Sequence, residues 1–311
     1  MVSVFSIIVT YNGMQWIERC LDCLLKSELQ THVVIVDNGS GDGTVDFIKA
    51  RYPSVELIET GKNLGFGQGN NIGLRSALQN NADYVFLLNQ DAYIQPQTIA
   101  ELVKAHISHP EFGILSPVHL NGTGANFDDH FYQYLLKSDI KDMISSCLIK
   151  DEKHHSIIST PFVNAAAWLI SKDCLTKTGG FDPIFFHYGE DDNYAQRVLF
   201  KKFKIGILPA SRVIHDRNRP SGQVPADVKT RIKKDWIHFL NQPCDIRNNK
   251  YLSLMVKRCL RYALQVLGSA ITFNKTELVY NFTMMRKILF SIAAVRRSRR
   301  ISLAGNGIPH L

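Results

Sequence analysis

The chain has 311 residues, which is long enough for one large domain or two small ones with a substantial buried core. Its 45% hydrophobic and 21% charged residues are ordinary values for a soluble globular protein. The net charge of +8 belongs mainly to the C-terminal segment, because Glu277 is the only acidic residue from Lys250 onward. We therefore expect an anionic partner for that segment and not for the whole chain.

The six cysteines are scattered, and only Cys20 and Cys23 have a spacing typical of metal sites. Both lie in a helical pattern without a second pair, so we expect reduced core thiols of a cytosolic protein instead of a zinc or redox site. The N-terminus enters a strand pattern directly, which predicts no signal peptide. No stretch of about 18 uncharged apolar residues is present, which predicts no transmembrane helix.

Strand and helix patterns alternate in the first hundred residues. Buried strands are predicted at 3–10, 32–36, 55–59 and 84–88, and helices at 14–27, 44–51 and 72–80. Residues 61–73 are rich in glycine and asparagine and are predicted to form a loop. This order predicts a mainly parallel, doubly wound sheet with helices on both faces.

The rest of the chain is less regular. A helix is predicted at 96–109, strands at 113–117 and 205–209, an apolar segment at 162–171, and helices across 228–300. Residues 119–160 form a polar insertion with little pattern, whose histidines we expect to be solvated: His119, His130, His154 and His155.

Polar residues follow three of the predicted strands. Tyr11 follows the first strand and could stack on a base, and Asp37 follows the second and could accept the imide N–H of uracil or thymine. Asn89-Gln90-Asp91 follows the strand at 84–88, where open α/β sheets bind ligands. The alternative for Asp91 is a turn that simply ends the strand.

Two common nucleotide-binding motifs are missing. Gly65-x-Gly67 is followed by Gly69, which breaks the dinucleotide fingerprint, and this segment follows the third strand and not the first. The P-loop signature is also absent from the sequence. A Rossmann dehydrogenase and a P-loop enzyme are therefore disfavoured.

Four segments together resemble the successive motifs of the family 2 glycosyltransferases, most closely the branch with bacterial rhamnosyltransferases. They are Ile7-Ile8-Val9-Thr10-Tyr11-Asn12, Val36-Asp37-Asn38-Gly39-Ser40, Asn63-x-Gly65-Phe66 with Gly69-Asn70-Asn71, and Leu88-Asn89-Gln90-Asp91. The resemblance extends over about residues 3–220 through Gly179-Gly180-Phe181-Asp182 and His215. It implies a GT-A fold and a nucleotide-sugar donor.

The resemblance also implies a metal and a donor site. The family's Asp-x-Asp motif holds a divalent cation on the donor diphosphate, and here Asn89 stands at its first position, which leaves Asp91 as the expected ligand of Mg²⁺ or Mn²⁺. His215 would complete that site. The expected donor-binding residues are Thr10, Tyr11, Asn12, Asp37, Asn38, Ser40, Asn63, Gly65, Asn70, Asn89 and, in a basic loop over the phosphates, Arg219.

Acidic residues 190–192 are expected to serve the acceptor. By resemblance Asp191 is the general base, with Glu190 beside it, and Asp192 and Trp168 are expected to contact the acceptor. Asn193 stands where the family usually has a second acid, which leaves the acceptor contacts open. The alternative is that these acids only stabilise a helix N-terminus.

Two basic amphipathic helices are predicted at 251–267 and 284–300. They suit an anionic membrane surface, or alternatively pack on the catalytic domain or on a second subunit as in a homodimer. Nucleic acid is not an expected partner, because the basic stretch lacks interleaved aromatic residues and a binding motif.

We therefore predict a GT-A catalytic domain at 1–225, with a nucleotide-binding half at 1–117 and an acceptor half at 118–225, and a basic helical segment at 226–311. The expected reaction is inverting transfer from dTDP-rhamnose to a cell-surface glycan or a polyprenyl-diphosphate-linked acceptor, at the inner face of the cell membrane. UDP-galactofuranose and UDP-N-acetylhexosamine remain open as donors. A sugar nucleotidyltransferase and a catalytically silent scaffold are the rival functions.

Overall fold

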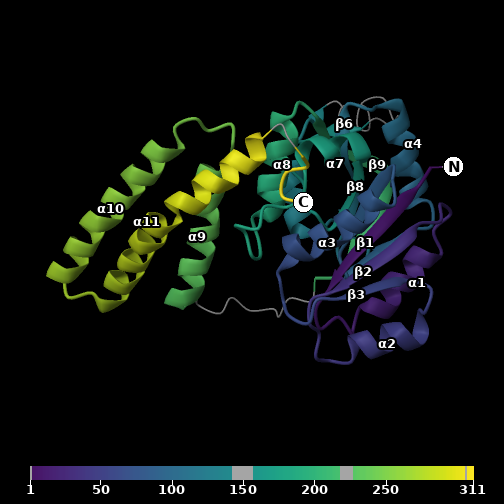
Figure 1. Ribbon diagram of the computed structural model, residues 1–311, viewed down its shortest axis with the longest axis horizontal. Helices are drawn as coiled ribbons and strands as arrows, with labels where there is room; N and C mark the ends of the chain where they lie inside the picture. The colour runs from purple at the N-terminus through teal and green to yellow at the C-terminus, as the bar shows by residue number, and fades with distance from the viewer. Residues whose placement is uncertain (1, 142–156, 218–226, 305–306) are drawn as a thin grey trace.

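Figure 1 shows the computed structural model, which describes residues 2–141, 157–217, 227–304 and 307–311. Its strands are β1 Val4–Thr10, β2 His32–Asp37, β3 Glu56–Glu59, β4 Tyr84–Leu88, β5 Ala92–Ile94, β6 Phe112–Leu120, β7 Ile158–Ser159, β8 Ala167–Ser171 and β9 Lys204–His215. Its helices are α1 Ile17–Leu25, α2 Thr44–Arg51, α3 Phe66–Gln79, α4 Thr98–Ser108, α5 Asp129–Leu135, α7 Lys172–Thr178, α8 Glu190–Phe200, α9 Val228–Cys244, α10 Tyr251–Ile271 and α11 Lys275–Leu303.

The strands form one mixed sheet in the order β3-β2-β1-β4-β8-β6-β9-β5, with β7 also pairing with β9. The pairs β2–β3, β1–β2 and β1–β4 are parallel, as the alternating sequence pattern predicts. Strand β8 then inserts antiparallel between β4 and β6. This insertion places Ala167, at the start of β8, opposite Leu88, at the end of β4, and the Asn89 amide donates a hydrogen bond to the Ala166 carbonyl at 2.9 Å. The two halves of the sequence therefore meet at one edge of the sheet.

Helices cover both faces of the sheet, as predicted. One core contains Leu21 of α1 and Leu102 of α4 packed against residues such as Ile8 and Phe86. The other contains Leu74 of α3 and the helices α7 and α8 packed against the opposite side of the same strands. Because strands buried on both faces need apolar residues at every position, β4 is an unbroken apolar run.

The loop predicted at 61–73 is largely helical, because α3 begins at Phe66 and not near residue 72. A Cβ atom on Gly73 would lie 2.5 Å from Ile7 Cγ2, and one on Gly69 would lie 2.8 Å from Val9 Cγ1. These glycines therefore let α3 approach β1 closely, and their value in packing outweighs their low helix propensity. Gly61, with φ +69°, and Gly65, with φ +84°, have the positive φ of loop residues and lie before the helix.

The region at 112–141 differs from the sequence prediction. Strand β6 continues to Leu120 and is followed by α5, while residues 142–156 lie outside the described part of the chain, together with His154 and His155. His119 is fully buried, which corrects the expectation that it is solvated. Its Nε2 lies 3.0 Å from the Ser116 hydroxyl oxygen and its ring stacks on Phe131.

Strand β9 is also longer than predicted and runs to His215. A shift in its register with β6, between Pro117 and Val118, separates its first part from a second part that pairs with β5. The short strand β5 was not predicted at all. Together β5 and the end of β9 place Ala92 opposite His215, which fixes the neighbouring Asp91 beside that histidine.

The C-terminal helices α9, α10 and α11 pack together beside the α/β part of the molecule (Figure 1). Their shared core includes Phe239, Met255, Ile288 and Val295, together with Phe185 from the loop before α8. The predicted boundary near residue 225 falls among residues 218–226, outside the described part of the chain, so the division into domains stays a prediction.

Helix α11 is long and apolar enough to cross a membrane by length and composition, and it is the one such helix in the ranges that the structure describes. The search for uncharged stretches did not indicate it, because Arg286 and Lys287 interrupt its apolar residues. The same features are found in core helices of soluble proteins, and the inner side of α11 buries Met284, Ile288 and Val295 completely.

Residues 307–311 return from α11 to the α/β part of the molecule (Figure 1). The Gly180 amide donates a hydrogen bond to the Pro309 carbonyl at 2.8 Å, and the Asn71 side chain of α3 donates to the His310 carbonyl at 3.4 Å. Ser298 of α11 bonds Asp182 in the turn before α8. The helical segment is therefore fastened to the α/β part by its last helix and by the residues after it.

Candidate active site

A cavity of about 810 Å³ opens at the edge of the sheet where β1, β2 and β4 end. The predicted nucleotide-binding half, residues 1–117, supplies Tyr11, Asn38, Asn63, Gly65, Asn89 and Asp91 to its wall. The other half supplies Ala165, Glu190, Asp191, His215 and Arg217. Nine of the predicted site residues therefore line a single cavity: Tyr11, Asn38, Asn63, Gly65, Asn89, Asp91, Glu190, Asp191 and His215.

Asp91 and His215 face each other across one end of the cavity. The Oδ1 atom of Asp91 lies 3.5 Å from Nε2 of His215, and the Asn89 amide nitrogen lies 3.4 Å from the same Nε2. His215 is 3% exposed, whereas Asp91 remains accessible from the cavity at 21%. The buried Oδ1 of Asn89 has no hydrogen-bond partner among the described residues, so an unpaired acceptor also borders this end.

The Asp91 and His215 side chains are suitable ligands for a divalent cation that also binds oxygen atoms of a substrate. A carboxylate oxygen and an imidazole nitrogen are both suitable donors for Mn²⁺, and an oxygen-rich remainder suits Mg²⁺. No group of three or more His, Cys, Asp and Glu side chains able to hold a metal occurs within the described ranges. The two residues would therefore hold the cation only together with oxygens from a diphosphate or water.

Two further charged residues surround the other side of the His215 ring. Arg217 Nε donates a hydrogen bond to His215 Nδ1 at 3.1 Å. Asp128, at the start of α5, places Oδ2 3.7 Å from the same Nδ1 and 3.2 Å from Arg217 Nε. Asp128 is only 5% exposed, so this is a buried group of one imidazole, one carboxylate and one guanidinium.

The acidic residues of α8 line the opposite side of the cavity. Glu190 and Asp191 occupy the first turn of α8, where the helix dipole favours negative charge. The helix is held in place by Arg197, which is buried and donates to the carbonyls of Thr178 and Gly180 at 2.6 Å each. The Gly179-Gly180-Phe181-Asp182 segment therefore serves to anchor the helix that carries the acids.

The environment of these carboxyl groups raises their pKa values. Burial raises the pKa of Glu190 to about 8, with a further contribution from the nearby charge of Asp191. Burial also raises the pKa of Asp191, and this is partly offset by hydrogen bonds from the backbone amides of Asp192 and Ala165 and by the charge of Arg217. A carboxylate with a raised pKa is a stronger base, which suits a proton acceptor.

Several predicted donor residues lie beneath the cavity wall instead of lining it. The Asp37 carboxylate accepts from the amides of Gly39 and Ser40 at 2.9 and 3.0 Å, and from the Ser40 hydroxyl. The Ser40 hydroxyl oxygen in turn accepts from the Asn12 amide at 2.9 Å. These contacts, like that of Thr10 with Gln90 at 2.7 Å, order the two turns that frame the cavity.

Asn70 is also buried beneath the wall, and its side chain donates to the Phe66 carbonyl at 3.0 Å. Trp168 is fully buried between Phe181 and Tyr194, which makes it a packing residue and corrects its expected contact with the acceptor. The reason is that β8 is a central strand whose side chains all face a core.

Asp192 and Asn193 follow Glu190 and Asp191 along α8, but neither lines the cavity. Asp192 is exposed and is not among the lining residues of the cavity. Asn193 is buried and accepts from Arg197 Nε at 3.0 Å, so it supports the helix and does not replace a catalytic acid. Arg219 lies among residues 218–226, outside the described part of the chain.

Sequence reasoning missed several lining residues, among them Gln90, His130, Tyr134, Asn164 and Tyr188. Asp128 and Tyr134 belong to α5, within an insertion that has no regular pattern and therefore gave no signal. For Tyr188 a signal existed, because it precedes Gly189 in a run of aromatic residues; its φ of +70° is uncommon for a residue with a side chain.

Comparison with known proteins identifies the family of this chain. Residues 6–177 match the family model described as glycosyl transferase family 2. N-acetylglucosaminyl-diphospho-decaprenol L-rhamnosyltransferase of Mycobacterium tuberculosis is 26% identical over 251 residues, which cover 75% of this chain and 82% of that protein. The dTDP-rhamnosyl transferase RfbF of Shigella flexneri is 25% identical over 219 residues, which cover 68% and 69% of the two chains.

Solved structures with the same fold include the mannosyltransferase PcManGT from Pyrobaculum calidifontis in complex with GDP-Man and Mn²⁺. Its TM-score is 0.57 at 19% identity, covering 94% of this chain and 86% of that one. S. aureus TarS in complex with UDP-GlcNAc gives a TM-score of 0.57 at 13% identity, with 97% and 86% covered. The GT-A fold predicted from the sequence is confirmed. The chain belongs to glycosyl transferase family 2 and is a glycosyltransferase.

Proposed function

We propose that this enzyme transfers rhamnose from dTDP-rhamnose, with inversion and with Mg²⁺ or Mn²⁺, to a hydroxyl group of a lipid-linked glycan precursor. One observation carries the proposal: Asp91 and His215 border the same cavity as Glu190 and Asp191. A cation-binding pair and a basic carboxylate are thus presented to one substrate-sized space. The two rhamnosyltransferase relatives support rhamnose as the sugar.

The chemistry assigned to the residues is a single displacement. Asp191 accepts the proton of the acceptor hydroxyl while the oxygen of that hydroxyl attacks the anomeric carbon from the face opposite the nucleotide. The bond from the anomeric carbon to the diphosphate breaks, and the nucleoside diphosphate leaves with the bonding electrons. A divalent cation held by Asp91 and His215 supplies Lewis-acid stabilisation of the charge on that leaving group.

The test is a donor screen on the purified full chain. Each of dTDP-rhamnose, UDP-galactofuranose, UDP-N-acetylglucosamine and GDP-mannose would be added with Mn²⁺, and the thermal unfolding temperature measured. We expect dTDP-rhamnose to raise it, because a ligand at about 100 times its Kd stabilises a protein by about 2.7 kcal/mol. EDTA should cancel the shift.

A shift with a different sugar would replace rhamnose but leave the transferase assignment in place. A shift that persists in EDTA would overturn the metal dependence. No shift with any donor would favour a catalytically silent scaffold. Formation of a nucleoside diphosphate sugar and pyrophosphate from a sugar 1-phosphate and a nucleoside triphosphate would instead favour the sugar nucleotidyltransferase.

We further propose that the enzyme is cytoplasmic and docks peripherally on an anionic membrane through α10. The outer side of α10 carries an apolar stripe at every third or fourth residue: Val256, Leu260, Leu264, Leu267 and Ile271. Each is between 54% and 77% exposed, and Phe273 in the following turn is 90% exposed. The other side of this helix, with Met255 and Cys259, faces the core of the helical segment.

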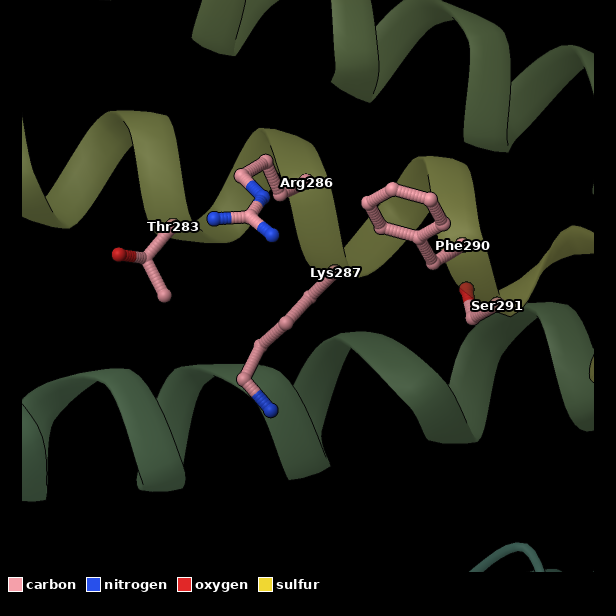
Figure 2. A pocket seen from close by; sticks show the side chains of 5 residues that line it. All are labelled: Thr283, Arg286, Lys287, Phe290 and Ser291. Atoms are coloured by element: carbon pink, nitrogen blue, oxygen red, sulfur yellow. The ribbon is translucent and has the colours of Figure 1, made fainter.

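Charge favours a bilayer over a second copy of the chain as the partner of this stripe. The exposed cations Lys257 and Arg261 lie on α10, next to the stripe in sequence. Arg286 and Lys287 of α11 line a separate hollow of about 380 Å³ with Thr283, Phe290 and Ser291 (Figure 2), where Lys287 lies over the Trp236 ring of α9. Glu277 is the only acid in the two helices and is bonded to Arg231. A homodimer through this face would bring cations together without acids, whereas anionic lipids attract each one by about 1 kcal/mol.

Vesicle sedimentation tests this docking. The full chain is expected to bind vesicles of phosphatidylcholine with phosphatidylglycerol, and to bind phosphatidylcholine alone weakly. Replacing Leu264 and Leu267 together with serine should weaken binding at least tenfold, because burying each leucine contributes about 1.5–3 kcal/mol. Ile107→Ser is the matched control, since Ile107 is 62% exposed on α4. Equal binding by both variants, or a dimer that the double variant dissociates, would contradict the proposal.

A further inference from the structure

Asp128 is a buried carboxylate whose two oxygens make separate contacts. Its Oδ1 caps α5, accepting from the amides of His130 and Phe131 at 2.9 and 3.0 Å. Its Oδ2 lies 3.2 Å from Arg217 Nε and 3.7 Å from His215 Nδ1. The cap alone would explain a residue on the surface, but it does not explain why the second oxygen is buried against two nitrogen atoms of β9 and the residues after it.

The His215 ring lies between two carboxylates, with Asp91 on the Nε2 side and Asp128 on the Nδ1 side. The ring is also held from a third direction, because His119 packs edge-on against it with centroids 6.1 Å apart. In this arrangement Nε2 faces the cavity and Nδ1 faces the protein interior. The orientation that presents Nε2 to Asp91 therefore depends on what lies behind the ring.

An imidazole that binds a cation through Nε2 must carry its proton on Nδ1, and it needs an acceptor for that proton. The nearest carboxylate oxygen to Nδ1 in the described structure is Oδ2 of Asp128. Arg217 Nε now donates to Nδ1, and it cannot do so once that nitrogen carries a proton. The Arg217 guanidinium must then turn away from Nδ1, while Oδ2 of Asp128 stays within reach of that guanidinium.

We propose that Asp128 is a positioning residue that orients His215 toward Asp91 and tethers Arg217 beside the donor phosphates. A cation on Nε2 would leave the imidazole proton on Nδ1, and Oδ2 of Asp128 would accept a hydrogen bond from it. Arg217 would then pair with an anionic group in the cavity instead of with Nδ1. This inference rests on the cation site of the proposed function, and adds a coupling between that site and the arginine.

The substitution Asp128→Asn separates the two roles of the side chain. Asparagine is as good an N-cap as aspartate, so α5 should remain capped and the unfolding temperature should stay close to that of the native enzyme. It removes the carboxylate oxygen that faces His215 and Arg217. Asp227→Asn is the matched control. Asp227 caps α9 by accepting a hydrogen bond from the Thr230 amide at 2.7 Å, and it is not one of the residues that line the cavity.

The measurement is Mn²⁺ binding to the full chain in the presence of dTDP, followed by the electron paramagnetic resonance signal of free Mn²⁺. We expect Asp128→Asn to weaken binding by about 10- to 100-fold, as is typical when a partner of a ligating histidine is lost. The KM for the donor should rise more than kcat falls. Asp227→Asn should bind Mn²⁺ like the native enzyme.

Two results would overturn the proposal and are distinguishable. Native-like Mn²⁺ affinity in a folded Asp128→Asn variant would reject the positioning role and leave the proposed function intact. Failure of the native enzyme to bind Mn²⁺ with dTDP would reject the cation site and the positioning role with it. A third variant, Asp128→Ala, should lose both the cap and the affinity, so its unfolding temperature should fall while that of Asp128→Asn does not.

Discussion

Replacing Asp91 with asparagine is expected to lower kcat/KM at least 10²- to 10³-fold, the usual loss when one stabiliser of transition-state charge is removed. Asparagine keeps the size and polarity of the side chain, and Asp91 is accessible from the cavity, so the fold should not change. The loss arises because the neutral amide is a much weaker ligand for a hard cation than a carboxylate. Initial rates at saturating Mn²⁺, together with thermal unfolding, measure it.

A control variant and a Mn²⁺ titration test whether the loss of activity comes from the Asp91 carboxylate. Asp46→Asn, at an exposed aspartate in α2, should retain full activity. If the Asp91 variant lost activity through reduced metal affinity alone, higher Mn²⁺ concentrations would restore part of the rate. An Asp91→Asn enzyme with native kcat/KM would show that this carboxylate has no part in the reaction, and would favour the alternative in which Asp91 belongs to a turn that simply ends the strand.

Replacing Asp191 with asparagine is expected to lower kcat by about 10²- to 10⁴-fold, the usual contribution of a positioned general base. In the native enzyme the base must be unprotonated, and burial raises the pKa of Asp191. The rate should therefore fall on acidification at a higher pH than an exposed aspartate would give. A profile of kcat/KM against pH reports this limb, which should disappear in the residual activity of the variant.

The same raised pKa has a consequence for stability. Between the ordinary pKa of an aspartate and the raised pKa in the folded protein, the folded chain binds a proton that the unfolded chain does not. The free energy of unfolding therefore falls as pH rises through that interval. Asp191→Asn removes the contribution of Asp191 to this dependence and should be more stable than the native enzyme at pH values above the interval, while the contribution of Glu190, whose pKa is raised to about 8, keeps the same sign. Denaturant unfolding at several pH values checks the sign, and Asp173→Asn on the exposed side of α7 should follow the native curve.

The main parts of the site could be predicted because parallel strands place their ends at one edge of a sheet. Asp91 follows such a strand. Residues 190–191 and His215, which line the cavity from the other half of the chain, were predicted from their resemblance to family motifs. The structure gathers all four in one cavity. The sequence could not tell which polar side chains turn toward the ligand. Asp37 and Ser40 form a hydrogen bond with each other instead, because both belong to the same turn.

Other features depend on contacts that leave no local pattern. The glycines of α3 resemble loop residues in sequence, yet they are needed where a helix approaches β1 too closely for a Cβ atom. The stripe on α10 has the same spacing as the buried side of that helix, and only the packing of α11 decides which of the two is exposed. Asp128 lies in an irregular segment, and its importance comes from residues almost ninety positions away.

The attachment of α11 and of residues 307–311 to the α/β part has a consequence for the length of glycan that the enzyme can extend. Gly180 and Asp182 hold this region next to α8, which carries Asp191. An enzyme docked through α10 would consequently keep its base at one fixed height above the lipid headgroups. The acceptor must bridge that height itself, so a lipid carrying one sugar and a lipid carrying many would not be equivalent substrates. The helical segment would therefore set the distance from the membrane at which a sugar chain can be extended.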